Sequence, residues 1–301
     1  MKCYFVVNPK AGGLNNEKII RDALKASKYA DDCEVYVTGG INDATRYVKQ
    51  ICSERPLEEK RFIACGGDGT INEVFNGAVG APNTSVTCYP CGSGNDFVKT
   101  YGGAERFTDI DKLIEAPTQK LDLMKVGDRY SDNVINFGFD TFVAITVNED
   151  RDRTGHGSKS SYTKGIIKSL ISHMKNEFKV YCDGELLNPE GVDLFCTIGN
   201  GQYVGGSFKC APRAVPNDGL MEVCIIKTVS RLMAPKLIGV YTKGEHLDDP
   251  SLKDKVRYTR AKKVEVVAPE GFAYSLDGEI IYDSHFTVEI VEGALDLAVP
   301  V

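Results

Sequence analysis

The first hundred residues alternate between short apolar runs and segments in which apolar residues recur at helical spacing. The apolar runs cover residues 3–7, 33–37, 62–65 and 86–89. Between them, apolar side chains fall on one helix face within residues 19–24, 44–51 and 71–79. Strands that alternate with helices in this way form a parallel sheet covered on both faces. We therefore predict an α/β domain whose ligands bind beyond the carboxyl ends of its strands.

The character of the chain changes after about residue 121, where strand-like runs dominate. These runs cover residues 121–126, 134–139, 178–181, 194–198, 221–226, 264–267 and 286–291. Because Gly, Asn or Asp turns separate many of them, we predict a largely antiparallel, sandwich-like second domain. Two helices are expected in it, over residues 161–175 and 230–241. A run of charged residues at 150–159 is predicted to form a loop.

Length and charge narrow the class of protein. The 301 residues suffice for two ordinary domains, which we place at residues 1–121, completed by 292–301, and at residues 122–291. With 36 basic and 42 acidic residues, the formal charge of −6 argues against binding to nucleic acid. Apolar stretches of about 18 residues are absent, so no transmembrane helix is expected. The first residues do not resemble a signal peptide, which predicts a cytoplasmic protein.

The ten cysteines raise the question of a metal or disulfide framework. Most of them lie in strand-like runs, where a free thiol packs as a small apolar group. Cys88 and Cys91 form a single Cys-x-x-Cys pair. A structural zinc site needs a second pair at suitable spacing, and the sequence has none. Reduced, buried thiols are therefore the expectation.

The strongest motif is Gly66-Gly67-Asp68-Gly69-Thr70, which ends a predicted strand and begins a predicted helix. Glycines let the backbone approach a phosphate, and the helix offers N–H groups and a positive dipole end. An acidic residue beside phosphates makes sense if it holds Mg²⁺ or accepts a proton. The alternative is a glycine turn with Asp68 as the helix N-cap.

Two further loops have a related composition. Tyr89-Pro90-Cys91-Gly92-Ser93-Gly94-Asn95-Asp96-Phe97 again follows a strand and begins a helix, so that Asp96 would lie opposite Asp68. Asn8-Pro9-Lys10-Ala11-Gly12-Gly13 ends the first strand, and Lys10 could contact a phosphate. It is not a Walker A loop, because the Gly-Lys-Ser/Thr ending is absent. By itself, the loop at residues 89–97 is more typical of an ordinary capped turn, and the loop at residues 8–13 is only weak evidence for a phosphate site.

Two late segments look like simple turns. Asn217-Asp218-Gly219-Leu220 is typical of a turn next to a strand, and Asp277-Gly278-Glu279 is typical of a hairpin turn. Their residues alone favour this structural interpretation over a functional one.

Taken together, the motifs resemble the diacylglycerol kinase catalytic-domain family, which includes bacterial diacylglycerol kinases and sphingosine kinases. The resemblance runs nearly from end to end. Beyond the loops already named, its segments are Lys120-Leu121-Asp122-Leu123, Asn136-Phe137-Gly138-Phe139-Asp140, residues 199–206, Ala211-Pro212, Asp218-Gly219-Leu220 and Leu276-Asp277-Gly278-Glu279. Ser93 stands where many members have Thr, and it keeps the hydroxyl.

The resemblance implies a fold: a three-layer α/β nucleotide-binding domain like that of NAD kinases and phosphofructokinases, then an antiparallel β-sandwich domain. It also implies that ATP and Mg²⁺ are used. The residues implied to contact ATP are Asn8, Pro9, Lys10, Ala11, Gly12, Thr38, Gly67, Asp68, Gly69, Thr70, Ile71, Asn72, Glu73 and Ser93.

The resemblance further assigns roles to acidic residues. Asp68, Asp96 and Asp122 would form a network around the catalytic Mg²⁺, partly through water. Glu279 would be the general base that accepts the proton of the lipid hydroxyl. A second, structural Mg²⁺ would be held by Asp218 and by the backbone carbonyls of Val215 and Leu220. These roles reverse the structural interpretation of both late turns.

The implied acceptor is a diacylglycerol-like lipid at a membrane surface, which the protein would contact peripherally. The best candidates for docking are Lys164, Lys168, Lys175 and Lys179, although these lysines are more typical of a solvated helix face. One alternative acceptor is another alcohol, such as a sphingoid base or a soluble molecule. A nucleotide-binding regulator without catalysis is an alternative from another class. The oligomeric state stays open, with a homodimer as one alternative.

Overall fold

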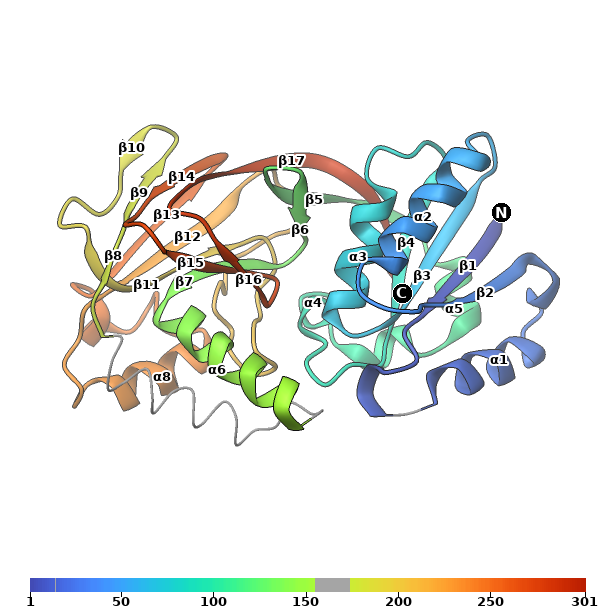
Figure 1. Ribbon diagram of the computed structural model, residues 1–301, viewed down its shortest axis with the longest axis horizontal. Helices are drawn as coiled ribbons and strands as arrows, with labels where there is room; N and C mark the ends of the chain where they lie inside the picture. The colour runs from blue at the N-terminus through green and yellow to red at the C-terminus, as the bar shows by residue number, and fades with distance from the viewer. Residues whose placement is uncertain (14, 155–173) are drawn as a thin grey trace. The chain divides into compact units, whose positions relative to one another are not determined.

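The computed structural model describes residues 1–13, 15–154 and 174–301. The chain forms two compact units, of which the first comprises Met1–Leu123 and Val291–Val301 and the second comprises Met124–Ile290. Two strands, β5 (Thr118–Val126) and β17 (His285–Ala298), begin in one unit and end in the other (Figure 1). The C-terminal segment therefore returns to the unit that contains the N-terminus.

The sheet of the first unit has the strand order β4-β3-β1-β2, and all three pairings are parallel. The end of β17 joins its edge, where Leu297 pairs with Val86 in parallel. All seven residues of β3 are buried, as are most residues of β1 and β4, because helices cover both faces of the sheet. The strands are β1 Lys2–Val7, β2 Cys33–Val37, β3 Lys60–Gly66 and β4 Thr84–Pro90.

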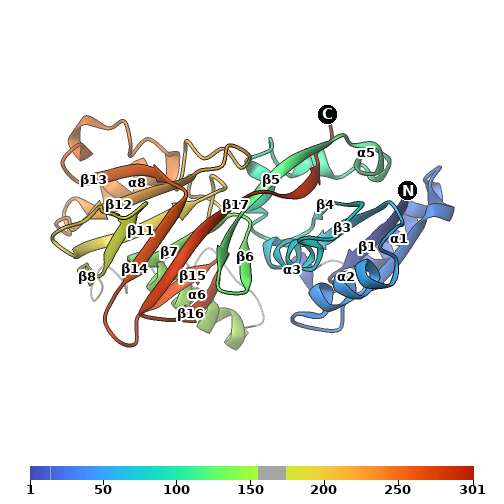
Figure 2. The same cartoon turned by 90° about the horizontal axis from the view of Figure 1, so that it is seen from above.

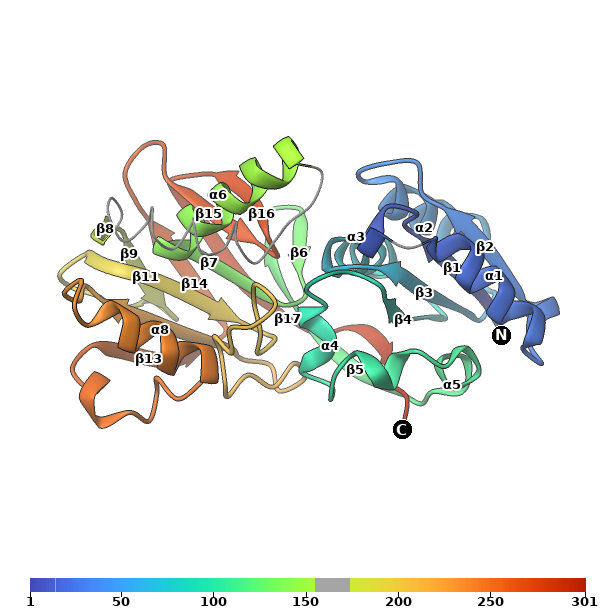
Figure 3. The ribbon, with the colours of Figure 1, turned by 90° about the horizontal axis from the view of Figure 1, so that it is seen from below.

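Connections between parallel strands are right-handed, and this determines on which face of the sheet each helix of the first unit lies. This rule places α1 on one face of the sheet and α2 with α3 on the other (Figure 3). The helices α2 and α3 pack closely at Gly77, where an added Cβ would lie 2.7 Å from the Cβ of Val48. The helices are α1 Asn16–Ala26, α2 Asp43–Glu54, α3 Asp68–Ala78, α4 Asp96–Lys99 and α5 Ile110–Glu115.

The second unit is built from antiparallel strands in two sheets (Figure 2). One sheet has the order β13-β12-β11-β7-β15-β16, with β8 paired to β11; the other contains β10-β9-β14-β17, and β6 pairs with β5. The strands are β6 Arg129–Ser131, β7 Val134–Gly138, β8 Asn176–Glu177, β9 Lys179–Cys182, β10 Glu185–Leu186, β11 Val192–Gly199, β12 Met221–Lys227, β13 Val256–Ala261, β14 Lys263–Val267, β15 Ala273–Leu276 and β16 Glu279–Tyr282.

Side chains of β11 and β12 alternate between two apolar clusters. Cys196 and Ile225 belong to a cluster shared by both sheets, whereas Phe195 and Ile226 belong to a cluster on the outer face. The outer cluster also contains residues of α6 (Phe139–Thr154) and α8 (Ala234–Lys243). Because successive residues of a strand point to opposite faces, burial on both faces makes these strands continuously apolar.

The expected fold class is confirmed: a parallel α/β unit is followed by an antiparallel β unit. Three details of the sequence prediction are wrong. Residues 150–154 belong to α6 instead of a loop, since Arg151 and Arg153 favour a helix as well as solvent. The strand expected to reach residue 139 ends at Gly138, whose φ of 93° turns the chain into α6. The helix α8 begins at Ala234, not at residue 230, because Pro235 occupies its first turn.

Other expectations concern residues that the structure does not describe. The helix predicted over residues 161–175 falls mostly there, and so do Lys164 and Lys168. Lys175 and Lys179 are exposed, the latter in β9. Among the described residues, the helices are too short or too polar to cross a lipid bilayer.

Candidate functional site

Four loops of the first unit follow the carboxyl ends of its parallel strands, and these ends lie along one edge of the sheet. The loops after β3 and β4 are in direct contact. The N–H group of Cys91 donates to the carbonyl oxygen of Gly66 at 2.8 Å. A Cβ added to Gly92 would lie 2.5 Å from the Cα of Gly67, so only glycines allow this approach of two backbones.

The loop after β1 joins the same group. Gly12 has a φ of 64°, and a Cβ there would overlap the carbonyl oxygen of Cys91. Asn8 donates from Nδ2 to the hydroxyl of Thr70 at 3.1 Å, and its Oδ1 accepts the N–H group of Lys10 at 3.0 Å. The loop that carries Lys10 is therefore fixed to the start of α3, while the Lys10 side chain is exposed.

Asp68 and Asp96 lie together although they follow different strands. The Oδ1 atom of Asp68 accepts the N–H group of Phe97 at 3.1 Å. An added Cβ on Gly94 would be 2.9 Å from Oδ2 of Asp68 and 3.5 Å from Oδ2 of Asp96. The two carboxylates therefore face the same small volume, as expected from the two loops.

The electrostatics of this pair suit a cation. Loss of solvent, and then the negative charge of Asp96, raise the pKa of Asp68 to about 6. Asp96 is paired on its other oxygen with Lys99, at 2.6 Å between Oδ1 and Nζ. Because proteins usually hold Mg²⁺ through one or two carboxylates together with phosphates and water, these two residues fit that ion.

Asp122 has a different environment. It lies buried in β5, and its Oδ1 accepts the N–H group of Gly293 at 2.7 Å. In the part of the chain that the structure describes, no three His, Cys, Asp or Glu side chains gather closely enough to hold a metal. Asp122 therefore does not complete a three-carboxylate ligand set with Asp68 and Asp96, and a link to them through water stays a prediction.

Other residues that are implied to contact ATP differ in how far they are exposed to solvent. Ser93 is exposed in its loop and Gly69 is exposed in the first turn of α3, so both are open to a ligand. Ile71 is buried in the core, and its N–H group donates to the carbonyl oxygen of Gly67 at 3.1 Å. Thr38 follows β2 and donates from Oγ1 to the carbonyl oxygen of Val7 at 3.3 Å. Ser93 and Gly69 are therefore better placed for direct contact with a ligand than Ile71 and Thr38.

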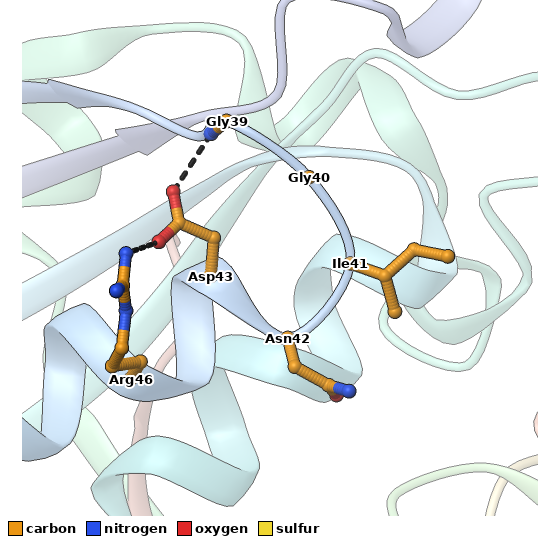
Figure 4. A pocket seen from close by; sticks show the side chains of 6 residues that line it. All are labelled: Gly39, Gly40, Ile41, Asn42, Asp43 and Arg46. Carbon is orange, nitrogen blue, oxygen red and sulfur yellow. Dashed lines mark hydrogen bonds and ion pairs between the residues drawn. The ribbon is translucent and has the colours of Figure 1, made fainter.

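A pocket of about 430 Å³ lies next to Thr38 in the sequence, at the loop between β2 and α2 (Figure 4). Asp43 holds this loop closed, since its Oδ2 accepts the N–H group of Gly39 at 2.7 Å. Asp43 also pairs with Arg46, and Figure 4 shows both interactions. The lining residues are Gly39, Gly40, Ile41, Asn42, Asp43 and Arg46.

In the second unit, Glu279 begins β16 directly after a tight hairpin turn. Asp277 and Gly278 form this turn with φ values of 47° and 89°, and Leu276 pairs with Glu279 across it. Two positive φ values are typical of the type I′ turn that Asp-Gly favours. The Glu279 carboxylate is exposed and forms an ion pair with Arg129 of β6. It is accessible to a substrate from solvent.

The half-buried Asp277 anchors this hairpin through its carboxylate. It accepts the hydroxyl of Ser131 at 2.9 Å and the N–H groups of Asp132 at 3.0 Å and Val134 at 2.8 Å. Its own N–H group donates to the carbonyl oxygen of Val134 at 3.0 Å. Burial raises the pKa of Asp277, and these hydrogen bonds oppose that effect. The position of Glu279 is therefore fixed by its neighbour in the turn.

The candidate structural metal site lies before β12. Asp218 accepts the N–H group of Leu220 at 3.1 Å on Oδ1 and pairs with Arg260 through Oδ2. The carbonyl oxygen of Val215 accepts the N–H group of Asn217 at 2.8 Å. Carboxylate and carbonyl oxygens are suitable Mg²⁺ ligands. Arg260 is the cation that Asp218 contacts in this structure, so Mg²⁺ would have to displace it.

Sequence reasoning missed several residues that shape these sites. The Asp96–Lys99 pair could have been found from its i,i+3 spacing on a helix. The close approach at Gly94 and the anchoring role of Asp277 had no such local signal. Arg129 and Glu279 are 150 positions apart, so nothing near either residue predicts their contact.

Comparison with known proteins gives two family matches. A family model described as the diacylglycerol kinase catalytic domain matches residues 2–126. A second, described as the YegS C-terminal NAD kinase beta sandwich-like domain, matches residues 133–299, more than half of the chain. The two matches together cover both units nearly completely.

Curated relatives match almost the whole chain at low identity. A probable lipid kinase YegS-like of Alcanivorax borkumensis is 27% identical over 288 residues, which are 95% of this chain and 93% of the relative. A diacylglycerol kinase of Bacillus subtilis is 29% identical over 278 residues, which are 91% of this chain and 88% of the relative.

A solved structure shows the same fold. It is described as a putative diacylglycerol kinase from Bacillus anthracis, with a TM-score of 0.75 and 22% identity. The match covers 99% of this chain and 97% of the other. At this identity, the similarity concerns the fold alone.

Proposed function

Because the chain belongs to the diacylglycerol kinase catalytic-domain family of lipid kinases, we propose that it transfers the γ-phosphate of ATP to the hydroxyl of diacylglycerol. The products are phosphatidic acid and ADP. The observation that carries this proposal is the meeting of Asp68 and Asp96 beside three loops at one edge of a parallel sheet. The Bacillus subtilis relative named diacylglycerol kinase supports the choice of acceptor.

The first unit would bind the triphosphate. Its glycine loops bring backbone atoms close to a ligand. The helix α3 begins at Asp68, and its N-cap residue, Gly67, has no side chain that could cap the first N–H groups. The positive end of the helix dipole favours phosphate at this position. Lys10 and Ser93 are exposed on neighbouring loops, where they can add a charge and a hydroxyl. The chain thus supplies binding and alignment, the main requirements of phosphoryl transfer.

Asp68 and Asp96 would hold the catalytic Mg²⁺. When bound, Mg²⁺ offsets the negative charge of the phosphates and of the developing leaving group. The raised pKa of Asp68 supports this role, because a bound cation would relieve the repulsion between this buried carboxylate and Asp96. Lys99 forms an ion pair with Asp96 and neutralises part of its charge. A bound cation would therefore stabilise the charged form of Asp68 more than that of Asp96.

Glu279 would act as the general base. A bond forms between the lipid hydroxyl oxygen and the γ-phosphorus, the bond from that phosphorus to the β–γ bridging oxygen breaks, and the hydroxyl proton moves to Glu279. An alcohol is a poor nucleophile near neutral pH, so a carboxylate at its proton speeds the step. The ion pair with Arg129 orients the carboxylate in the absence of substrate. A structural Mg²⁺ at Asp218, Val215 and Leu220 would stabilise the second unit.

The proposed substrate also implies contact with a membrane surface, because diacylglycerol resides in bilayers. The exposed Lys175 and Lys179 are candidates for contact with anionic lipid headgroups. Each lysine near such a surface contributes about 1 kcal/mol. This contact would be peripheral.

A transfer assay with an acceptor panel tests the proposed function. Radiolabelled ATP and Mg²⁺ are supplied with diacylglycerol, sphingosine or NAD in detergent micelles. We expect label in phosphatidic acid. Label in sphingosine phosphate or NADP would support the kinase chemistry and refute the acceptor. Nucleotide binding without transfer to any acceptor would favour a regulator without catalysis.

A further inference from the structure

We propose that Glu73 is a positioning residue of the nucleotide site, which ties α3 to the start of α2 and so holds the loop of residues 38–43. This inference rests on the proposed function, which assigns Thr38 and the neighbouring loops to ATP. The resemblance to the family implies instead that Glu73 contacts the nucleotide. The structure gives its carboxylate different partners.

Both carboxylate oxygens of Glu73 accept backbone N–H groups from the start of α2. Oε1 accepts from Asn42 at 2.9 Å, and Oε2 accepts from Ala44 at 3.2 Å. The hydroxyl of Thr45 donates to the carbonyl oxygen of Glu73 at 2.8 Å. Three hydrogen bonds therefore connect one turn of α3 to the first turn of α2.

This connection replaces a missing helix cap. Asn42 is the N-cap residue of α2, but its φ of 62° is left-handed and its side chain makes no capping bond. The first N–H groups of a helix lack partners within the helix and need an acceptor from elsewhere. Glu73 supplies that acceptor from another helix, with a negative charge that the N-terminus of α2 favours.

The other end of the loop is also held by a carboxylate. Asp43 accepts the N–H group of Gly39 at 2.7 Å and the hydroxyl of Tyr36 at 2.9 Å. These hydrogen bonds and Arg46 lower the pKa of Asp43, the Gly39 N–H group having the largest effect. Residues 39–43 thus run between two fixed points, and they line the pocket next to Thr38.

Glu73 links this loop to the acidic pair through a single helix. It lies on α3, whose first residue is Asp68, and α3 packs against α2 at Gly77 without room for a Cβ. Removing the Glu73 carboxylate would leave this packing in place and release the loop alone. The fraction of molecules with a correctly placed loop would fall, and nucleotide affinity would fall by the same factor.

Two measurements on four proteins test the inference. The proteins are the wild type, Glu73→Ala, Glu73→Gln and the control Glu54→Ala, which removes an exposed carboxylate from the far end of α2. Calorimetry gives the affinity for ADP with Mg²⁺. Amide hydrogen exchange without nucleotide reports on residues 39–44. Thermal unfolding verifies that each variant is folded.

We expect Glu73→Ala to exchange faster at residues 39–44 and to bind ADP on the order of tenfold more weakly. Glu73→Gln keeps one acceptor oxygen and should lie between Glu73→Ala and the wild type, while Glu54→Ala should match the wild type. Weaker binding with unchanged exchange would overturn the inference in favour of direct contact with the nucleotide. Faster exchange with unchanged affinity, or no change in either, would also overturn it.

These outcomes separate the inference from the proposed function. A wild type that binds no ADP would refute the proposed function, and the exchange comparison would still decide whether Glu73 holds the loop. ADP binding requires no lipid acceptor, so a wrong choice of acceptor leaves the test intact.

Discussion

Asp68 and Asp96 direct carboxylate oxygens at the position that a Cβ on Gly94 would occupy, at 2.9 Å and 3.5 Å respectively. The two residues begin different helices, α3 and α4, after different strands. Such convergence places two negative charges where the glycine loops can bring a phosphate. The pair therefore predicts how nucleotide binding depends on pH and how it responds to a substitution at Gly94.

Binding of ADP with Mg²⁺ should weaken as the pH falls through about 6. Burial and Asp96 raise the pKa of Asp68 to about 6, so below that pH a proton occupies the carboxylate and competes with the cation. Affinity should be highest above about pH 7 and fall by about tenfold per pH unit once Asp68 is mostly protonated. Calorimetry between pH 5 and 8 measures this, with Asp68→Asn as the comparison. The same pH dependence in Asp68→Asn would contradict the assignment.

Gly94→Ala should impair nucleotide binding while the protein stays folded. The added methyl group would press on Oδ2 of Asp68 at 2.9 Å, a distance that real Cβ contacts do not tolerate. The carboxylates would be forced apart, and Mg²⁺ would lose part of its ligand set. Affinity for ADP with Mg²⁺, measured by calorimetry, should fall on the order of tenfold, equivalent to about 1.4 kcal/mol.

A matched glycine provides the control. Gly239 lies exposed in α8, and a Cβ there would meet no atom within 4 Å. Gly239→Ala should stabilise the helix by about 0.5–1 kcal/mol and leave nucleotide binding as in the wild type. Equal affinities for Gly94→Ala and Gly239→Ala would show that the volume between the carboxylates is not the cation site.

Asp277→Ala should lower both stability and phosphate transfer. It leaves the N–H groups of Asp132 and Val134 without their acceptor, at about 1–3 kcal/mol for each unsatisfied group. It also frees the hairpin that positions Glu279. Chemical denaturation measures the first effect, and the transfer assay under conditions where the variant is folded measures the second.

Asp183→Ala is the control for this turn. Asp183 also has a positive φ, 49°, precedes a glycine, and accepts the N–H group of Lys263 at 2.9 Å. It belongs to the β9–β10 hairpin, which carries no residue assigned to nucleotide binding or to proton transfer. Stability should fall in both variants, but transfer should fall only in Asp277→Ala. Unchanged transfer in a folded Asp277→Ala would refute its positioning role.

His246 should make the second unit sensitive to acid. Its side chain is 1% exposed, and burial lowers its pKa to about 4. Between about pH 4 and 6.5, the unfolded state binds a proton that the folded state does not. The free energy of unfolding should therefore decrease as the pH falls through this window, by roughly 3 kcal/mol in total.

Denaturation curves at pH 4.5 and 7.5 measure this effect. His246→Leu removes the titrating group and should show a smaller difference in stability between these two pH values. If the wild type and His246→Leu lose the same stability on acidification, another group is responsible.

The sequence predicted the parallel sheet well because its signal is local. Each strand of the first unit is an apolar run, and α1, α2 and α3 each show one apolar face. The meeting of Asp68 and Asp96 followed from topology, since parallel strands end at the same edge of a sheet. Short strands such as β8 and β10, each of two residues, carry too little pattern to be predicted.

The contacts that refine the site were beyond sequence reasoning for a physical reason. Glu73 has ordinary helix-forming character, and its amide partners, Asn42 and Ala44, are about thirty positions away on another helix. Asp277 looked like a turn residue, which it is, but its side-chain hydrogen bonds reach residues 131–134. Partners of this kind are set by tertiary packing, which local patterns do not encode.

The central claim is tested most directly by the rate of phosphate transfer from ATP to diacylglycerol in mixed micelles with Mg²⁺, compared between the wild type and Glu279→Gln. The variant removes the proposed base at an exposed position, so it should fold and bind ADP as the wild type does. We predict that the wild type forms phosphatidic acid and that Glu279→Gln is slower by about 10²–10⁴. Equal rates in the two proteins, or no phosphatidic acid from a wild type that binds ATP, would contradict the account.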